Sequence, residues 1–296
     1  MKRTLLLALA ISIFLASSAS AATTAPPIAI PLLPLSPTVS TNFTGGDEIS
    51  QLLTSPTNIL VFGTIETTTS RLVISPPLGG SDGFISALTP QGGRAWDLRL
   101  GTAGDDVATA GCLDTQGNIW VAGASTNPAS SLSGLTRLTV WEVSSTGSLV
   151  NTFTKDLSDI DIPTSIAIKG GNFILQGVSA KSGFPTFAVT VSPLGAIGPV
   201  KNATAKPAPN AQNFYVASSA YGWQSFNSTK SVKGVLGLGS PQGINYLLKS
   251  SLKDKVLKAA YSVQGAPLAM QYQPNIGVVL LTQGSGSYFL NILHTK

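Results

Sequence analysis

Short apolar runs, rich in β-branched and aromatic residues, alternate along the chain with clusters of Gly, Ser, Asn, Pro and Asp. No stretch keeps apolar residues at the three- and four-residue spacing of an amphipathic helix. Runs of this length between turn-forming residues are typical of β-strands joined by tight turns. The pattern therefore predicts an all-β protein.

One strand recurs at intervals of 60 and 54 residues. Asn-Ile-Leu-Val-Phe-Gly at 58–63 returns as Asn-Ile-Trp-Val-Ala-Gly at 118–123 and as Asn-Phe-Ile-Leu-Gln-Gly at 172–177. Weaker copies lie at 222–226 and 276–282. A short strand and a tight turn precede each copy, and a second hairpin follows most of them. Each period thus predicts four antiparallel strands.

A four-stranded unit of this size cannot bury both of its faces alone and must stack on its neighbours. Radial stacking of such units gives a β-propeller. The periods predict five blades, at 49–100, 106–154, 163–200, 212–261 and 267–293. The last period lacks an outer strand, and we expect the N-terminal strand near 40–44 to complete it and close the ring. Six blades is the alternative, because the fourth period is weakly marked.

The N-terminus has the features of a secretory signal peptide. Lys2 and Arg3 precede an apolar run at 5–15, and Ala-Ser-Ala at 19–21 is a cleavage site. We expect cleavage after residue 21, a Pro-rich linker at 22–38 and a single propeller domain at 39–296. An uncleaved N-terminal anchor is the alternative. No later run is long enough to span a bilayer, so the mature chain is expected outside the cytoplasm.

Part of the repeat has a familiar sequence. Gly-Ser-Asp-Gly-Phe-Ile-Ser-Ala-Leu-Thr-Pro-Gln-Gly at 80–92, with Trp96, resembles the bacterial SBBP-type β-propeller repeat, as do residues 104–107 and 112–123. The resemblance covers about 80–125 and continues elsewhere only as a pattern. It implies a secreted or surface-exposed propeller. The family name suggests seven blades, against five counted here, and the family has no catalytic motif to transfer.

The composition excludes several kinds of site. The chain has one Cys and one His, His294, so internal disulfides, Cys-based metal sites and multi-His metal sites are excluded, and a Ser-His-Asp triad is disfavoured. Charged residues are only 10% of the chain. The lone Cys112 lies in an apolar strand, which is typical of a small buried hydrophobe.

Acidic residues concentrate between the last strand of one blade and the first strand of the next, with Asp47, Asp106 and Asp161 as the candidates. Three interpretations are open. Aspartates accept backbone N–H bonds in turns; separate blades could assemble a Ca²⁺ site; or two carboxyl groups could serve a glycoside hydrolase. Because these positions read as exposed polar turns, nothing obvious is expected to raise a pKa there.

The charge is divided along the chain, with a net charge of −5 over residues 22–199 and +8 over 200–296. The lysine-rich C-terminal third predicts either a solvated face or a surface for an anionic polymer or glycan. Nucleic acid is not expected, because no arginine follows Arg137. Most tryptophans are expected to pack between blades, with Tyr221 and Trp223 as candidates for ligand contact.

These patterns favour a secreted binding or structural module at the cell surface without catalytic activity. A carbohydrate-active hydrolase that uses the acidic residues is the alternative, and a purely structural domain without a small ligand is a third hypothesis.

Overall fold

The computed structural model describes residues 29–294 except 44, 132, 208–212 and 238. Within this part of the chain the regular secondary structure is all β, in five sheets. Blade one contains β3 (Glu48–Thr54), β4 (Ile59–Ile65), β5 (Asp82–Leu88) and β6 (Arg94–Leu100); blade two contains β7 (Asp106–Leu113), β8 (Ile119–Ser125), β9 (Arg137–Val143) and β10 (Leu149–Asp156).

The other three blades follow the same antiparallel order. Blade three contains β11 (Asp161–Lys169), β12 (Asn172–Ser179), β13 (Thr186–Val191) and β14 (Lys201–Ala203). Blade four contains β15 (Phe214–Ala217), β16 (Tyr221–Ser228), β18 (Ile244–Ser251) and β19 (Leu257–Ser262), and blade five β20 (Ala266–Gln273), β21 (Gly277–Gly284), β22 (Ser287–Leu293) and β2 (Val39–Asn42). The five periods are confirmed, although blade three ends at 203 and not at 200.

The turns between the third and fourth strands of the first three blades are built alike. Gly92, Gly147 and Gly195 occupy the same place in these turns with φ of 84°, 88° and 80°. Each donates its N–H to the carbonyl three residues earlier. A positive φ is costly for any residue with a Cβ atom, which explains why glycine recurs here.

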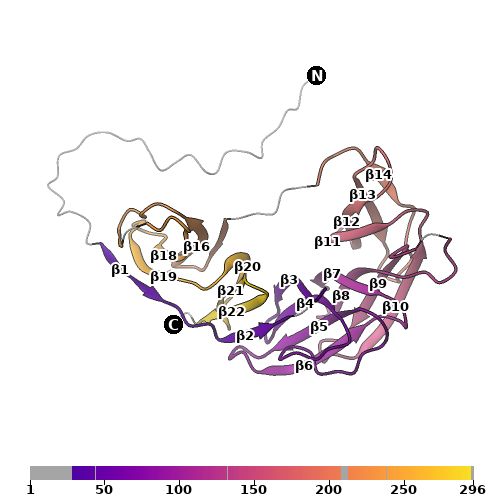
Figure 1. The fold of residues 1–296 in the computed structure, drawn as a ribbon, viewed down its shortest axis with the longest axis horizontal. Helices are drawn as coiled ribbons and strands as arrows, with labels where there is room; N and C mark the ends of the chain where they lie inside the picture. The colour runs from indigo at the N-terminus through magenta and orange to yellow at the C-terminus, as the bar shows by residue number, and fades with distance from the viewer. Residues whose placement is uncertain (1–28, 44, 132, 208–212, 238, 295–296) are drawn as a thin grey trace, which may run out of the picture.

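The first strands of the blades lie next to one another at the inner side of the molecule. β3 packs against β7 and β20, β11 packs against β7, and β15 packs against β20. The blades therefore follow one another in the order four, five, one, two, three along an arc (Figure 1). This radial arrangement of four-stranded sheets is that of a β-propeller.

Blades three and four lie at the two ends of the arc (Figure 1), and no extensive contact joins them among the described residues. Their outward faces expose polar side chains together with some large apolar or aromatic ones. On blade three Gln176 and Thr190 are exposed, whereas Leu175 beside them is buried against blade two. On blade four Tyr215 is 62% exposed. The side of blade four that faces away from blade five also carries an apolar cluster of Phe226, Tyr246 and Leu248.

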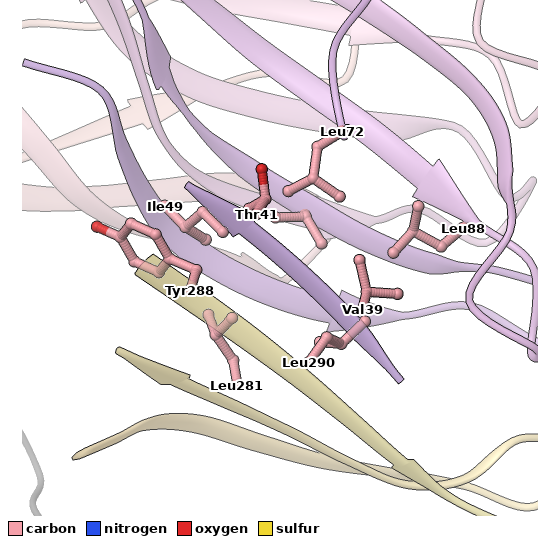
Figure 2. A pocket seen from close by; sticks show the side chains of 9 residues that line it. Val39, Thr41, Ile49, Leu72, Leu88, Leu281, Tyr288 and Leu290 are labelled. Atoms are coloured by element: carbon pink, nitrogen blue, oxygen red, sulfur yellow. The ribbon is translucent and has the colours of Figure 1, made fainter. Parts of the chain in front are cut away.

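The N-terminal strand completes the last blade, as predicted, but the predicted closure of the ring is not seen among the described residues, since blades three and four share no extensive contact. β2 pairs with β22 in the register Val39 to Leu290 and Thr41 to Tyr288. Val39, 2% exposed, also packs on blade one, in the same cluster as Leu72 and Leu88. Figure 2 shows the seam, where these side chains surround a cavity of about 10 Å³, room for at most one water.

The expectation that 22–38 is only a linker is wrong for its last part, because residues 30–34 form the strand β1 (Ile30–Pro34). β1 runs parallel to β19 and also pairs with β17 (Val235–Leu236), which covers the outer edge of blade four. Proline is tolerated in such a peripheral strand because few of its N–H groups are needed. The predicted signal peptide and residues 22–28 lie outside the described residues.

Aromatic side chains join neighbouring blades, as expected. Trp120 of blade two stacks on Phe173 of blade three, with ring centroids 4.1 Å apart. Trp141 is 2% exposed, in a cluster with Phe62 of blade one. These positions leave both tryptophans inside the protein, where they stabilise blade packing.

Candidate functional site

Asp47 joins two loops on one face of the molecule. Its Oδ1 accepts the N–H of Glu66 at 2.6 Å, and its Oδ2 accepts the hydroxyl of Thr68 at 3.3 Å. In return, Glu66 Oε1 accepts the N–H of Gly46 at 3.0 Å. This reciprocal pair ties the entry to blade one to the loop at 66–81, so Asp47 serves loop structure.

Asp106, the first residue of β7, is fully buried. Its Oδ2 accepts the N–H of Thr102 at 2.7 Å and the hydroxyl of the same residue at 3.0 Å, whereas Oδ1 has no hydrogen-bond partner among the described residues. Burial raises the pKa of Asp106, the nearby charge of Asp82 adds to the shift, and hydrogen bonds from Ser125 and Thr102 oppose it. Asp106 holds the connection from blade one to blade two.

Asp161 has the equivalent position in blade three, as the first residue of β11, but lines an open cleft. The cleft has a volume of about 310 Å³ and lies between blades two and three. Asp161 is 4% exposed, and its Oδ1 has no hydrogen-bond partner within the described structure. We call this depression the Asp161 cleft.

Burial raises the pKa of Asp161, and the charge of Asp159 in the same cleft raises it further. The hydroxyl of Ser179 and the ammonium group of Lys181 act in the opposite direction. Ser179 faces Asp161 across the strand pair and also accepts the N–H of Lys181 at 3.1 Å and the amide of Asn202 at 3.4 Å. Ser179 therefore fixes two groups beside the carboxyl, the backbone of Lys181 and the side-chain amide of Asn202.

The rest of the cleft wall combines charged and apolar groups. Asp156 is paired with Arg137, whose Nε lies 2.7 Å from its Oδ1. Lys155 contributes a second ammonium group, and Leu157 and Val200 contribute apolar surface. A hydroxyl-rich ligand would find donors, acceptors and an apolar wall within one small depression.

Two expectations about the acidic residues need correction. Asp106 and Asp161 are not exposed turn residues, since each begins a strand and is buried with a raised pKa. The structure also does not bring the three candidates together among the residues that line the Asp161 cleft, because Asp47 and Asp106 bond to the loops at 66–68 and 102 instead. Among the described residues, no group of three or more His, Cys, Asp or Glu side chains is arranged to hold a metal ion, so the Ca²⁺ hypothesis gains no support.

Tyr221 and Trp223 lie together on β16 but face the protein. Trp223 is 3% exposed and belongs to the cluster between blades four and five. The Nζ of Lys249 lies 3.9 Å from the ring centroid of Tyr221 and 5.1 Å from that of Trp223. One of the C-terminal lysines is thus engaged in a cation–π contact that covers both rings.

A buried ion pair on blade one, between Arg99 and Asp82, was not predicted from the sequence. Arg99 Nη1 lies 2.9 Å from Asp82 Oδ2, and the two side chains are 1% and 0% exposed. The guanidinium also donates to the carbonyls of Ser75, Glu66 and Thr68. This one side chain anchors the loop at 66–81. Arg99 occupies a polar position of the alternating run at 96–100, so the sequence pattern gives no indication that its side chain is buried.

No family model and no curated protein matches the chain. Several solved structures match the chain at low identity and low TM-score. The Pan2 WD40 domain of Neurospora crassa matches at 12% identity over 84% of this chain and 90% of that one, with a TM-score of 0.34. A xylan β-1,4-xylosidase from Bacillus halodurans matches at 14% over 84% and 44%, with a TM-score of 0.37. The periplasmic gluconolactonase PpgL of Pseudomonas aeruginosa matches at 13% over 83% and 71%, with a TM-score of 0.33.

These neighbours include a WD40 domain and enzymes, and at such TM-scores they carry no argument about chemistry. The assignment of the β-propeller fold rests on the strand order and blade packing of this structure. The described part of the chain contains no helix of the length and apolarity needed to cross a membrane.

Proposed function

We propose that this protein is a secreted β-propeller that binds a glycan at the cell surface without cleaving it. The observation that carries the proposal is the Asp161 cleft, where the carboxyl of Asp161 lies beside the Ser179 hydroxyl in a wall that also holds the amide of Asn202 and the ammonium group of Lys181. A carboxylate in this position accepts hydroxyl hydrogen bonds, and charge-assisted bonds of this kind are stronger than neutral ones. The predicted signal peptide and the SBBP-like residues at 80–125 support the location.

The size and composition of the cleft fit a single sugar residue of a larger polymer. Small-molecule sites have volumes of about 300–1,000 Å³ and combine a few fixed polar groups with apolar wall. Asn202 and Lys181 can donate to ring hydroxyls beside Asp161, while Leu157 and Val200 can contact the C–H face. An acidic or neutral glycan is compatible with the two lysines of the cleft.

The lysine-rich C-terminal third is the second part of the proposal, as a surface that attracts an anionic polymer. Lys253 and Lys255 are exposed in the turn at 252–256, and Lys258 pairs with Asp254 at 3.5 Å. Surface charges of one sign raise the association rate of oppositely charged partners and act less at high salt. This contribution is expected to be diffuse.

The hydrolase hypothesis has weaker support. It needs an acid and a second carboxylate on opposite sides of one bond. Asp47 and Asp106 are engaged in loop hydrogen bonds. Asp156 and Asp159 accompany Asp161 in the cleft, and Asp156 is already paired with Arg137. The raised pKa of Asp161 is the one property that a general acid would share.

The test is a glycan array probed with the secreted chain, residues 22–296, and with two matched variants. D161N and D106N make the same chemical change at equivalent strand positions, but only the first alters a cleft. We expect D161N to lose at least about tenfold in affinity, on the scale of a lost hydrogen bond to a charged group, and D106N to bind like the wild type. Retention of binding by D161N, or absence of any glycan ligand, would refute the proposal. Release of reducing sugar from a bound glycan, lost in D161N, would replace it with the hydrolase.

A further inference from the structure

A second cleft, of about 300 Å³, lies where blade one meets blade five, away from the Asp161 cleft. Its wall includes Arg71, Arg94, Gly92 and Gly93. We call it the Arg71 cleft. None of the described residues that line it is acidic, and Asp97 pairs with only one of its two guanidinium groups, so the cleft keeps a positive charge.

Arg71 belongs to the loop at 66–81, whose backbone is fixed at this point. Leu72 and Val73 next to it are 3% and 0% exposed. The hydroxyl of Ser70 accepts the N–H groups of both at 3.2 and 3.1 Å, and the carbonyl of Leu72 accepts the hydroxyl of Ser86 at 2.8 Å. The side chain of Arg71 is exposed on this fixed base.

Arg94 is held in one orientation beside it. Its Nη1 donates to the carbonyl of Arg71 at 3.1 Å, and its Nε lies 3.3 Å from Asp97 Oδ1. Asp97 in turn accepts the N–H groups of Ile74 and Ser75 at 3.0 and 2.8 Å. The carboxylate of Asp97 is therefore shared between Arg94 and two backbone N–H groups. Nη2 of Arg94 has no partner among the described residues.

The glycines keep the wall of the cleft open. Gly92 has a φ of 84°, and a Cβ atom there would lie 2.9 Å from side-chain carbons of Thr38 and Val39. Both properties exclude a larger residue at position 92, so this position adds no side chain to the wall of the cleft.

The arginines of the described chain differ in how they are used. Arg99 is buried against Asp82, and Arg137 is paired with Asp156. In contrast, the guanidinium of Arg71 makes no hydrogen bond or ion pair within the described structure. A planar guanidinium presents donors in the geometry that matches two oxygens of a tetrahedral or carboxylate anion, and a second one beside it adds charge.

We propose that the Arg71 cleft binds a tetrahedral oxyanion, a sulfate or phosphate monoester carried by a surface polymer. Arg71 provides the bidentate contact, and Arg94 provides the second charge. The site is independent of the glycan proposal, because it lies on a different blade junction and shares no residue with the Asp161 cleft.

The experiment is calorimetric titration of residues 22–296 with sodium sulfate and then with sodium phosphate, at low chloride concentration. R71Q removes an exposed guanidinium and should leave the fold intact, which circular dichroism checks. K253Q is the matched control, since it removes one exposed positive charge on blade four. We expect saturable binding by the wild type and by K253Q, at least about fivefold weaker binding by R71Q, and an intermediate affinity for R71K, which keeps the charge but not the fork.

Glucose 6-sulfate, glucose 6-phosphate and glucose then distinguish the source of the anion. Either ester should bind in an Arg71-dependent way while glucose should not, and the tighter ester names the polymer chemistry. Equal affinities of R71Q and wild type, equal losses in R71Q and K253Q, or no saturable binding by the wild type would each overturn the site. D161N should bind these anions like the wild type, so failure of one proposal leaves the other measurable.

Discussion

Replacing Arg99 by methionine tests the buried ion pair that anchors the loop at 66–81. The substitution keeps an apolar stem but leaves Asp82, which is fully buried, without its counter-charge. Three backbone carbonyls of the loop lose their donor at the same time. Glu66 loses the bond from Nη1 at 2.6 Å, Ser75 loses the bond from Nε at 3.0 Å, and Thr68 loses the bond from Nη2. Removing one partner of a buried ion pair costs about 3–5 kcal/mol.

Urea unfolding followed by tryptophan fluorescence measures this change. With an m-value of about 3 kcal/mol/M, a loss of about 4 kcal/mol lowers the midpoint by about 1.3 M. The loop should also become a site of early proteolysis, because Leu72 and Val73 depend on it for their places in the core between blades one and five.

The double variant D82N/R99M separates the charge from the loop contacts. Removing both partners should recover much of the loss, since the uncompensated charge is then gone while the carbonyls stay unpaired. A cost below about 1 kcal/mol for R99M, as for an exposed pair, would refute the reasoning. The same conclusion would follow if D82N/R99M were no more stable than R99M.

Three further expectations follow from single features. Burial raises the folded-state pKa of Asp106 above its ordinary value of 3.8. At pH values between 3.8 and the folded-state pKa, the folded protein holds a proton that the unfolded chain lacks, so stability falls as pH rises through this range. D106N should flatten this part of the pH profile in thermal melts. A chain that starts at residue 38 lacks β1 and should melt at lower temperature, whereas one that starts at 44 also lacks β2 and should not give a cooperative transition; equal melting of the two would contradict the role of β2. Burial raises the pKa of Cys112 to about 12, so native protein should react with iodoacetamide at pH 8 much more slowly than urea-unfolded protein, and equal rates would place the thiol at the surface.

The repeat made the blades predictable from sequence. Copies of one strand at 58–63, 118–123 and 172–177 fixed the period, and the leftover strand at the N-terminus fixed its pairing with the last blade. The sequence carries this information because successive side chains of a strand point to opposite faces of the blade, and both faces pack against neighbouring blades, so each strand appears as a short apolar run. β1 escaped prediction since its two prolines indicate a linker, and its partners lie about two hundred residues away.

The candidate site was predictable only in part. Asp161 could be selected from the sequence as an acidic residue between two blades. Its burial, and the different roles of Asp47 and Asp106, depend on loop conformations that the sequence pattern does not predict. Lys181 and Asn202 reach the cleft from the same blade as Asp161 only through the pairing of β11, β12, β13 and β14. The Asp82–Arg99 pair likewise forms through tertiary packing, and no short sequence motif indicates that these two residues are partners.

The most direct test of the glycan proposal is the pH dependence of affinity for the glycan that the array selects, measured by calorimetry on wild type and D161N. If the ionised carboxylate of Asp161 accepts the ligand's hydroxyl groups, wild-type affinity should fall as pH is lowered through a pKa above 3.8, and D161N should bind weakly with a flat profile. Equal affinities and equal pH profiles for the two proteins would contradict the account.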